Sequence, residues 1–392
     1  MVNKKAYIVI GLGYGDEGKG LTTDYLCLNN LEPLVIRFNG GHQAGHCVVT
    51  KDGKKHVFSN FGSGTFRKVP TYWSSYCTVA PVFLMEELEI LDIECKIYID
   101  KHCPITTHYD ILYNRSKEIT LGKNRNGSCG VGFGATVDRE KQAVSLLFRD
   151  LFDSEEKLRE KLLEIKKFYR FKVNVNTAFD FDNFDHSRED NIFFRSIKKI
   201  KNLFEKDLIV PITQREIFNK NWSTYIFEGA QGILLDQNYG DKPHITKSNT
   251  TSKNAIEILK EQQIDIPIEI FYVTRAYQTR HGNGTFRKKH PKFQLRNNQN
   301  ETNVLNKFQG EFKANFLDVD AIQYALKCDK QFSHLYPKNL MITCLDQIEG
   351  EELIFFEEGN LKSIHFSSIH KKLKTEFKNI KYSFSPCAEY IE

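Results

Sequence analysis

The sequence predicts an α/β protein with a mainly parallel central sheet flanked by helices. Short apolar runs of strand length alternate along the chain with helical segments, and this alternation favours parallel strands joined by crossover helices. Several of these runs end in loops rich in glycine and polar residues, as strands of open α/β sheets do at the edge where ligands bind. The chain of 392 residues is long enough to bury a large core.

The composition argues against several other classes of protein. Hydrophobic residues make up 40% of the chain and the net charge is only +5, which argues for a folded globule without a nucleic-acid-binding surface. No run approaches the roughly 20 apolar residues of a membrane span. The nine cysteines form no CxxC pair, which is typical of reduced thiols, and the apolar run near the N-terminus is too short for a signal peptide. We therefore expect a cytoplasmic protein without a membrane partner.

Residues 6–24 (AYIVIGLGYGDEGKGLTTD) predict a strand at 7–10, a glycine-rich turn and the start of a helix. Such a turn presents backbone N–H groups where a phosphate can bind. Lys19 adds a positive charge, and Asp16 adds a carboxylate that can hold Mg²⁺ or accept a proton. The spacing is neither that of a Walker A loop nor that of a Rossmann fingerprint. A plain turn with solvated charges is the less favoured alternative.

The segment 33–99 continues the alternation of strands and helices. We expect strands at 33–38, 76–83 and 96–99, a helix at 84–91, and a hairpin at 48–58 around Asp52-Gly53. The strand at 33–38 runs into a second glycine-rich loop, NGGHQAGH, which carries His42 and His46.

Helices and loops dominate the middle of the chain. Residues 124–134 (NRNGSCGVGFG) form a third glycine-rich loop, and 154–169 is a charged amphipathic helix with Asp153 or Ser154 as its N-cap. We expect loops and short helices over 172–194, and a helix with solvated lysines at 198–206.

The alternation returns after residue 221. We expect strands at 222–228, 268–273 and 340–345, helices at 255–262 and 318–327, a polar loop at 241–252 and a hairpin at 352–366. The first of these strands leads into FEGAQG (227–232), and the second leads into TRAYQTRHGNG (274–284). Residues 291–303 are very polar.

Five loops thus share one pattern, in which a strand is followed by small and polar residues. In an open α/β sheet such loops gather at the carboxyl ends of the strands, where ligands bind. Any one of them could be a simple turn, but five together predict a composite nucleotide site.

Six motifs occur in order between residues 7 and 346: GYGDEGKG, RFNGGHQAGH, FEGAQGILLD, HITKSNTT, RAYQTRHGNG and TCLD. Together they resemble the adenylosuccinate synthetase family, with a weaker match at 383–386 (SFSP). The family joins the amino group of L-aspartate to C6 of IMP, using GTP and Mg²⁺. The resemblance implies a P-loop-NTPase-like fold with small inserted subdomains, a homodimer, and a ligase of purine biosynthesis.

No linker or repeat divides the chain, so we expect one elaborated domain over 1–392. Its nucleotide-binding core would comprise about 1–100 and 222–350, with a helical insertion at about 100–220. Residues 350–392 would complete the GTP site.

The resemblance also implies roles for individual residues. Asp16 matches the base that takes the N1 proton of the purine, and His46 matches the acid that stabilises O6 and the transferred phosphoryl group. Lys19 is the third catalytic residue, and Mg²⁺ is held by Asp16 and the Gly45 carbonyl. The implied GTP-binding residues are Gly15, Glu17, Gly18, Gly20, Gly45, Asp346 and Ser385. The implied purine monophosphate-binding residues are Gln43, Ser128, Cys129, Arg139, Gln231, Thr246 and Arg280.

Several of these positions depart from the family's pattern. Ser128 and Cys129 replace two threonines that bind the 5′-phosphate, and a thiol is the poorer donor. Arg139 is the nearby candidate for an arginine that the family borrows from the neighbouring subunit, although its register differs. Gln43 replaces the usual Asn, which hints at another purine or sugar. Asp346 matches the guanine reader, but Cys344 replaces the usual Lys two places earlier, so ATP is an alternative to GTP.

The largest departure is in the loop that binds aspartate in the family. That loop is rich in arginine, whose planar group pairs with carboxylates bidentately. Here no arginine follows Arg296. The candidates for the amine-acceptor loop are Thr302, Asn303, Gln309 and Lys313. Neutral hydrogen bonds largely replace charge-assisted ones, so another amine, or water, is an alternative to L-aspartate.

The sequence leaves other functions open besides a ligase acting on an IMP-like nucleotide. A divergent relative could use a guanine (deoxy)nucleotide, as a viral enzyme of this kind does, although that enzyme usually lacks the acid that Asp16 matches. A phosphotransferase could stop at the phosphorylated purine. A catalytically silent nucleotide-binding module is a further alternative, which the presence of Asp16, Lys19 and His46 disfavours.

Overall fold

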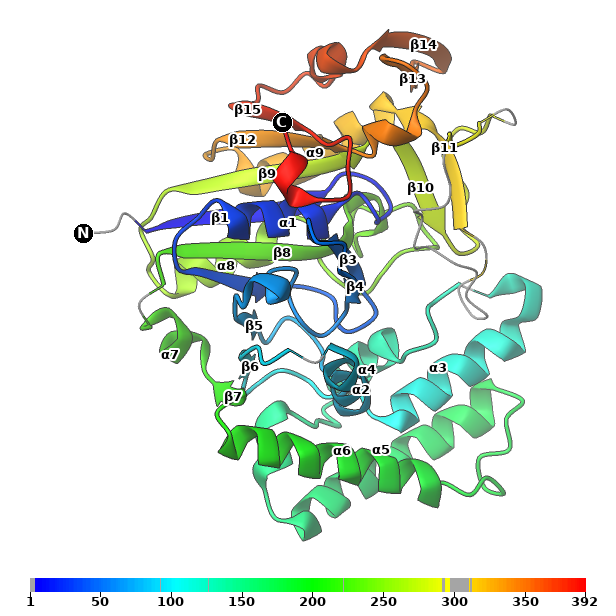
Figure 1. Cartoon of the computed structure of the whole chain (residues 1–392). Helices are drawn as coiled ribbons and strands as arrows, with labels where there is room; N and C mark the ends of the chain where they lie inside the picture. The colour runs from blue at the N-terminus through cyan, green and yellow to red at the C-terminus, as the bar shows by residue number, and fades with distance from the viewer. Residues whose placement is uncertain are drawn as a thin grey trace.

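A nine-stranded sheet crosses the molecule in the computed structural model, which describes residues 4–91, 93–125, 127–220, 222–290, 293–296, 310 and 312–392 (Figure 1). Its strand order is β15-β12-β9-β1-β8-β2-β5-β6-β7, and neighbouring strands pair in parallel. The strands are β1 (Lys5–Gly11), β2 (Pro33–Arg37), β5 (Thr71–Trp73), β6 (Ile97–Asp100), β7 (Ile209–Ile212), β8 (Thr224–Gly232), β9 (Ile268–Arg275), β12 (Lys338–Thr343) and β15 (Asn379–Tyr382). The predicted mainly parallel sheet is confirmed.

Strand β1 lies at the centre of the sheet, between β8 and β9. Its Ile8 pairs with Phe227 on one side and with Ile270 on the other, and Ile8, Val9 and Ile10 are at most 1% exposed. A strand covered on both faces needs a continuous apolar run rather than an alternating one, which explains the run at 7–10.

The remaining strands form smaller sheets beside the main one. The four-stranded sheet has the order β10-β11-β13-β14, and β3 pairs with β4 as a separate hairpin. These strands are β3 (His46–Val49), β4 (Lys55–Phe58), β10 (Tyr277–His281), β11 (Phe312–Asp318), β13 (Glu352–Glu357) and β14 (Asn360–His365). The predicted hairpins at 48–58 and 352–366 are confirmed.

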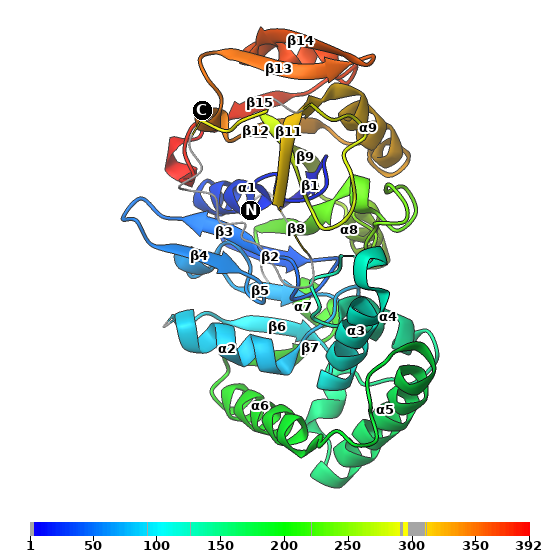
Figure 2. The ribbon, with the colours of Figure 1, turned by 90° about the vertical axis from the view of Figure 1, so that its right-hand side faces the viewer.

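Helices cover both faces of the main sheet and gather at one end of it. They are α1 (Lys19–Leu28), α2 (Pro81–Leu91), α3 (His108–Leu121), α4 (Phe133–Glu140), α5 (Glu155–Asn176), α6 (Ser187–Glu205), α7 (Gln214–Phe218), α8 (Lys253–Glu261) and α9 (Val319–Ser333). Short 3₁₀ helices are η1 (Thr65–Arg67), η2 (Gly122–Asn124), η3 (Phe148–Phe152), η4 (Ile233–Leu235), η5 (Leu345–Gln347), η6 (Phe366–Lys372) and η7 (Ala388–Tyr390). In Figure 2, α5 and α6 lie at one end of the molecule and the β13–β14 hairpin lies at the other.

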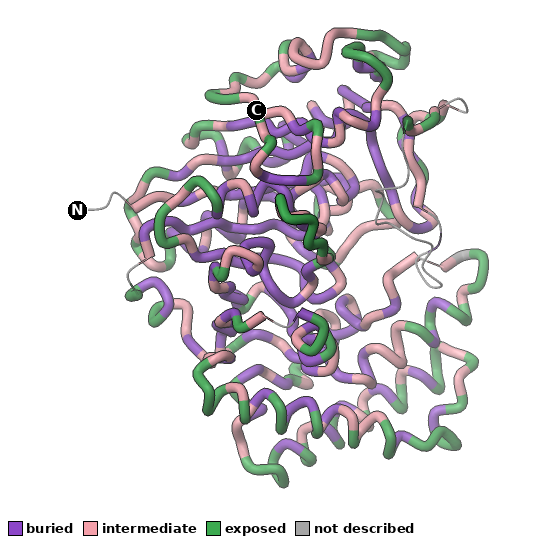
Figure 3. The backbone as a smooth tube through the Cα atoms, in the orientation of Figure 1, coloured by how far each residue is buried: buried purple, intermediate pink, exposed green. Residues whose placement is uncertain are grey.

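The hydrophobic core follows this arrangement. One cluster lies against the middle of the sheet and includes Ile8, Phe227 and Ile270. A second lies among α2, α3, α5 and α6, and includes Tyr169 and Ile197. Figure 3 shows the strands of the main sheet as nearly continuously buried, whereas α5 and α6 alternate between buried and exposed positions. Residues 101–208 therefore leave the sheet after β6, share this second core with α2, β5 and β6, and return at β7.

Capping residues place the helix starts. Ser154 accepts a hydrogen bond from Lys157 N at the start of α5, as predicted. Asp318 does the same for Ala321 N in α9. By contrast, α1 begins after Gly18, whose φ is 97°, and no side chain caps it. Its first N–H groups are therefore left for a ligand.

Some predicted elements differ from the structure. Residues 76–80 are not a strand; the strand is β5, and α2 already begins at Pro81. Residues 172–194 contain the end of α5 and the start of α6, not mainly loops, and residues 277–281 of the predicted loop form β10. All nine cysteines are described and none forms a disulfide. In the described part of the chain, every helix is too short or too polar to cross a membrane.

Candidate active site

A cleft of about 670 Å³ opens where the strands β1, β2 and β8 end. All five predicted loops contribute to its wall, which confirms that they form one site. The described lining residues from these loops include Tyr14, Gly15, Asp16, Gly18, Lys19, Gly20, Gln43, Ala44, Gly45, His46, Ser128, Cys129, Gly132, Gln231, Arg275, His281 and Gly284. Residues 243–247, with Thr246 among them, close one side.

Side chains of three other strands hold the turn at residues 15–17. Thr279 Oγ1 donates to the carbonyl oxygen of residue 15 at 3.2 Å, Arg275 Nε donates to that of residue 16, and Thr343 Oγ1 donates to that of residue 17 at 2.7 Å. The backbone of Asp16 adopts φ 64°, a left-handed conformation that costs free energy in a non-glycine residue. Three separate hydrogen bonds offset that cost and fix where Asp16 points.

The carboxylate of Glu17 lies inside this turn rather than in the cleft. Its Oε1 accepts from Gly13 N at 3.0 Å and from Gly15 N at 2.8 Å, its Oε2 pairs with Lys19 Nζ, and the side chain is 4% exposed. Gly232 makes room for it, because a Cβ there would lie 2.3 Å from Glu17 Oε1. Two of the N–H groups expected to meet a phosphate thus already bind an internal anion, so the open N–H groups are those at the start of α1.

Asp16 faces the cleft and pairs with His281 at its wall. The distance from His281 Nε2 to Asp16 Oδ2 is 2.9 Å, and 23% of the Asp16 side chain is exposed. Burial alone would raise the pKa of Asp16, but His281, Arg275 and Lys19 lower it below the ordinary value. The carboxylate is therefore ionised at neutral pH and can accept a proton or bind a cation.

His46 lines the same cleft and rests on a buried carboxylate. Its Nδ1 lies 2.9 Å from Glu228 Oε1, and Glu228 in turn lies 3.9 Å from the buried guanidinium of Arg37. Ser63 donates to Glu228 from its backbone N and its hydroxyl. The loop carrying His46 packs directly on α1, since a Cβ at Gly20 would lie 3.0 Å from His46 Cβ. The loop carrying His46 therefore packs on the first turn of α1, which follows directly after the turn that carries Asp16.

The electrostatics of this pair follow from its burial. Although burial opposes ionisation, His46 and Arg37 lower the pKa of Glu228 to about 2, so it is a carboxylate at neutral pH. Burial lowers the pKa of His46, and Glu228 opposes that shift. An anionic ligand reaching His46 would favour its protonated form, which would make the imidazolium a donor to that ligand.

Neutral hydrogen-bonding groups complete the wall. Both amide atoms of Gln43, and Oε1 of Gln231, are shielded from solvent and have no hydrogen-bond partner among the described residues. Buried polar groups are normally satisfied, so these two amides fit a polar ligand in the cleft. Gln231 adopts φ 61°, as non-glycine residues at functional sites often do.

The loop carrying Ser128 and Cys129 is fastened to α3. Asn114 Nδ2 donates to Ser128 Oγ at 2.9 Å, and Glu118 accepts from the backbone N of Gly127 and of Ser128. Burial raises the pKa of the Cys129 thiol to about 11, so it is a protonated, weak donor at neutral pH. Ser128 and Cys129 both line the cleft, as expected for a phosphate loop.

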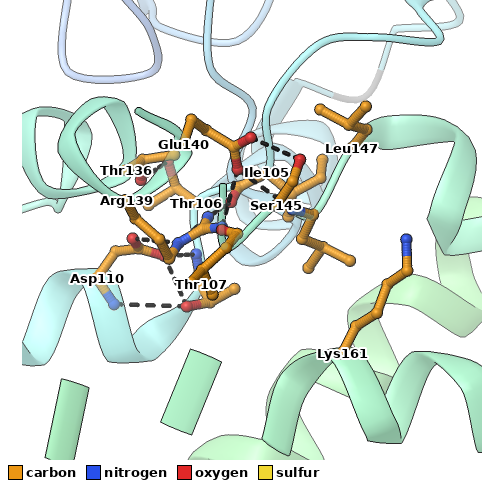
Figure 4. Close-up of polar contacts among 12 residues, drawn as sticks. Ile105, Thr106, Thr107, Asp110, Thr136, Arg139, Glu140, Ser145, Leu147 and Lys161 are labelled. Carbon is orange, nitrogen blue, oxygen red and sulfur yellow. Dashed lines mark hydrogen bonds and ion pairs between the residues drawn. The ribbon is translucent and has the colours of Figure 1, made fainter. Parts of the chain in front are cut away.

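Arg139 does not line the cleft. Its guanidinium is fully buried between α3 and α4, where Nε donates to Asp110 Oδ1 at 3.0 Å and Nη1 donates to Glu140 Oε1 at 2.8 Å (Figure 4). Tyr169 of α5 also donates to Asp110. The structure thus places Arg139 at the centre of a polar cluster that joins three helices, and not at the position expected for a phosphate ligand.

Arg280 lies one layer behind the cleft wall. It stacks on the ring of Tyr14 at 4.0 Å and donates to the carbonyl oxygens of Thr285 and His244. Lys313 Nζ likewise donates to the carbonyl oxygens of Gly282 and Gly284. Both cations thus hold the loop that borders the cleft, and neither is among the residues that line it.

The other predicted residues lie apart from this cleft. Asp346, in η5, accepts from Gln347 Nε2 at 2.8 Å, and Leu345 N donates to the carbonyl of Ser383. The segment with Ser385 therefore runs beside Asp346, past the ends of β12 and β15. Thr302, Asn303 and Gln309 lie outside the described residues.

The donor set at Asp16 fits the expected magnesium ion. In the described residues no three His, Cys, Asp or Glu side chains gather as a metal site would require. A single carboxylate nevertheless suffices for Mg²⁺ at phosphate sites, where phosphates and waters supply further oxygen ligands. Asp16 and Gly45 both line the cleft, so residues that offer a carboxylate and a carbonyl oxygen border the same space.

Sequence reasoning missed several residues of this site. Glu228, Arg275, Thr279 and His281 lie within the quoted motifs but were given no role. In all four cases the contact joins segments more than 180 residues apart in the chain. If residues 277–281 are taken as a strand, Thr279 and His281 lie on one face, because alternate residues of a strand point the same way.

Comparisons with known proteins show which family this chain resembles. The family model described as adenylosuccinate synthetase matches residues 8–355. The adenylosuccinate synthetase of Hydrogenovibrio crunogenus is 30% identical over 299 residues, which cover 72% of this chain and 63% of that protein. That of Nitrosomonas eutropha is 31% identical over 288 residues, covering 71% and 63%. The match thus spans less than two thirds of the length of these relatives.

Two solved structures share the fold. The fully ligated adenylosuccinate synthetase from Plasmodium falciparum superposes with a TM-score of 0.76 at 18% identity, covering 98% of both chains. The succinoaminodeoxyadenylate synthetase (PurZ) of cyanophage S-2L, bound to dGMP and dATP as an energy donor, gives a TM-score of 0.65 at 14% identity, covering 100% of this chain and 95% of that one. At these identities the likeness concerns the fold.

Proposed function

The chain belongs to the adenylosuccinate synthetase family, and on that premise we propose that it is a ligase that exchanges the C6 oxygen of a purine nucleotide for an amine. GTP is the proposed phosphoryl donor and an IMP-like monophosphate the acceptor. The observation that carries the proposal is that Asp16 and His46 line one cleft, next to the open N-terminus of α1. A purine lactam oxygen is a poor leaving group, so it must be activated before an amine can replace it.

In the first step the purine O6 attacks the γ-phosphorus of GTP. The O6–P bond forms, the bond between that phosphorus and the β–γ bridging oxygen breaks, and GDP leaves with the electron pair. Asp16 takes the N1 proton, so negative charge moves to O6 as it attacks. Protonated His46 donates to O6 and the moving phosphoryl group, and Glu228 supports that charge from behind.

In the second step the amine nitrogen attacks C6. The C–N bond forms, the C6–O6 bond breaks, and phosphate leaves carrying O6; the amine gives up a proton to solvent. Lys19 and the α1 N-terminus would hold the donor phosphates. Mg²⁺ held by Asp16 and the Gly45 carbonyl would neutralise charge between those phosphates.

The nucleotide base of the donor fits beside Asp346. A carboxylate accepts from the N1–H and N2–H₂ groups of guanine, which adenine lacks. The monophosphate fits the wall formed by Gln43, Gln231, Thr246 and the Ser128–Cys129 loop, whose groups are mainly neutral. ATP is the alternative phosphoryl donor, and a guanine (deoxy)nucleotide is the alternative acceptor to an IMP-like monophosphate.

The amine is the least constrained substrate. Lys313, a predicted carboxylate ligand, is engaged with loop carbonyls, which favours an amine with fewer carboxylates than L-aspartate. We also propose a cytoplasmic homodimer, on the family resemblance alone.

Mass spectrometry of products tests this function. The protein is incubated with Mg²⁺, GTP or ATP, each of IMP, GMP and dGMP, and a pool of amino acids. We expect one new C6-substituted nucleotide and a stoichiometric amount of phosphate, with both absent in Asp16→Asn. Phosphate release without any amine would instead indicate a phosphotransferase, and nucleotide binding without turnover would indicate a silent binding module.

A further inference from the structure

We propose that His281 is a positioning residue for Asp16: it holds the carboxylate in one rotation so that the same oxygen always faces the purine. The inference rests on the proposed function, in which Asp16 takes the N1 proton. Nothing in the sequence reading gave His281 a role. The structure brings it to the cleft wall with Nε2 at 2.9 Å from Asp16 Oδ2.

The direction of this contact follows from its chemistry. An ionised carboxylate has no proton to give, so the ring nitrogen must be the donor, which assigns the Nε2–H tautomer or the doubly protonated ring to His281. Hydrogen bonds to an ionised partner are about twice as strong as neutral ones. Such a bond resists rotation of the carboxylate about its Cβ–Cγ bond.

The strand β10 holds the imidazole in place. His281 is its last residue and pairs with Phe312 of β11, and the two rings pack with their centroids 5.2 Å apart. The His281 side chain is only 16% exposed. Its position is therefore set by a paired strand rather than by a loop, which is the more accurate support for a catalytic group.

The same strand grips Asp16 at a second point. Thr279 lies two residues before His281, on the same face of β10, and donates to the carbonyl oxygen of Gly15. β10 thus binds the backbone just before Asp16 and the side chain of Asp16 itself. A left-handed residue with this two-point support has little freedom to turn its carboxylate away from the substrate.

The role predicts a loss in rate rather than in binding. Without the donor, Asp16 would sample rotations in which no oxygen faces N1, and a misplacement of about 1 Å can cost about 100-fold in rate. Substrate affinity would change little, because His281 orients the base and does not hold the phosphates.

The test compares His281→Val, which removes the donor, with His281→Gln, which keeps an N–H at the end of the side chain. We expect Val to lower kcat about 10- to 100-fold with KM for both nucleotides within about 3-fold, and Gln to recover most of kcat. His102→Val removes an exposed histidine paired with Asp100 at the end of β6, outside the residues that line the cleft, and should leave both constants unchanged. Equal losses in Val and Gln, or a loss confined to KM, would overturn the proposal.

A measurement without turnover separates this inference from the proposed function. In protein with ¹⁵N-labelled histidine, the His281 Nε2 resonance should move in Asp16→Asn more than that of any other histidine. If the wild type turns over no substrate but this shift is present, the ligase function fails and the contact stands. If the resonance does not move, the positioning role fails whatever the activity.

Discussion

At the scale of single residues, the glycine-rich turn is built around an internal anion. The Glu17 carboxylate takes the N–H groups of Gly13 and Gly15 and the ammonium of Lys19, and the neighbouring glycines leave it space. Both charged side chains of the pair are at most 4% exposed. Removing one partner of a buried pair leaves the other charge uncompensated, which costs more than the pair itself contributes.

Glu17→Gln should therefore destabilise the protein by about 3 kcal/mol. Urea denaturation measures the change. Glu155→Gln, which breaks the exposed pair with Arg159, is the control and should change stability by no more than about 0.5 kcal/mol. The double variant Glu17→Gln, Lys19→Met should be less destabilised than Glu17→Gln alone. Equal stabilities for Glu17→Gln and the control would contradict a buried ion pair.

Gly232→Ala tests the packing around the same carboxylate. A Cβ at Gly232 would lie 2.2 Å from the Gly13 carbonyl oxygen and 2.3 Å from Glu17 Oε1, and overpacking of this kind costs about 1–3 kcal/mol or more. Gly134→Ala lies in α4, and its Cβ would meet only the flexible Lys247 side chain, at 3.5 Å or more. It should be neutral or stabilising by up to about 1 kcal/mol. Thermal unfolding compares the two. A neutral Gly232→Ala would show that the turn has another conformation.

His42 should make stability depend on pH. Burial lowers its pKa from 6.5 to about 4, where it stacks on Phe83 and contacts the Val131 carbonyl. The unfolded chain takes up a proton near pH 6.5 and the folded chain only near pH 4, so stability falls as the pH drops through that window. The lowering of the His42 pKa from 6.5 to about 4 corresponds to about 3 kcal/mol of unfolding free energy in total.

His42→Gln should remove that part of the slope. Unfolding free energies at pH 7, 5.5 and 4.5 measure it, and the difference between wild type and variant should grow toward acid. If the unfolding free energies of wild type and variant change in parallel with pH, His42 has the same pKa in the folded and the unfolded chain.

The sequence predicted the residues proposed for catalysis better than the residues that hold them in place. Asp16, Lys19 and His46 were found from the motifs because their residue types suit the chemistry, and they do line one cleft. The roles of Glu17, Arg139 and Arg280 could not be predicted, because a charged side chain near a loop can face the ligand or the interior. Only the contacts of the folded chain, such as that of Asp110 with Arg139, show which of these two directions a side chain takes.

At the scale of secondary-structure elements, the helices α3, α4 and α5 are joined by a polar cluster. Asp110 accepts from Arg139 and from Thr107 (Figure 4). It also accepts from Tyr169 and is fully buried. Because α3 also fastens the Ser128 loop through Asn114 and Glu118, this cluster supports one wall of the cleft.

Asp110→Asn should destabilise the protein by about 3–5 kcal/mol, because it removes the main counter-charge of the buried Arg139. Asp182→Asn, which removes an exposed partner of Arg170, should change stability by less than about 1 kcal/mol. Differential scanning calorimetry measures both. A small effect of Asp110→Asn would mean that Glu140 alone compensates Arg139.

Elements with long apolar or amphipathic patterns were predicted well, and short ones in loops were not. β1, β8 and the first part of α5 have clear apolar patterns and match the structure, although α5 continues beyond the predicted residue 169 to Asn176. β5 (Thr71–Trp73) has only three residues, and β10 (Tyr277–His281) is short and rich in polar residues. Both form because neighbouring strands supply their hydrogen bonds, which the local sequence does not show.

At the scale of the whole molecule, the parallel sheet gathers residues that are far apart in the sequence. Loops following β1, β2, β8 and β9 all open at the same edge, so residues between 14 and 284 line one cleft. The fold class and the convergence of the four loops that follow strands could be predicted, because parallel strands end at one edge. The loop at 124–134 was also expected to follow a strand, but it follows α3. Which residues of each loop face inward could not be predicted, because that depends on register and on side-chain contacts.

The central claim is that this cleft makes the purine O6 leave as phosphate. Its most direct test uses a purine monophosphate labelled with ¹⁸O at O6, incubated with Mg²⁺, GTP and the amine found to support turnover. The inorganic phosphate is then analysed by mass spectrometry. The account predicts one ¹⁸O atom in each phosphate released with product. Product formation with unlabelled phosphate would show that O6 is never phosphorylated, and would contradict the roles assigned to Asp16 and His46.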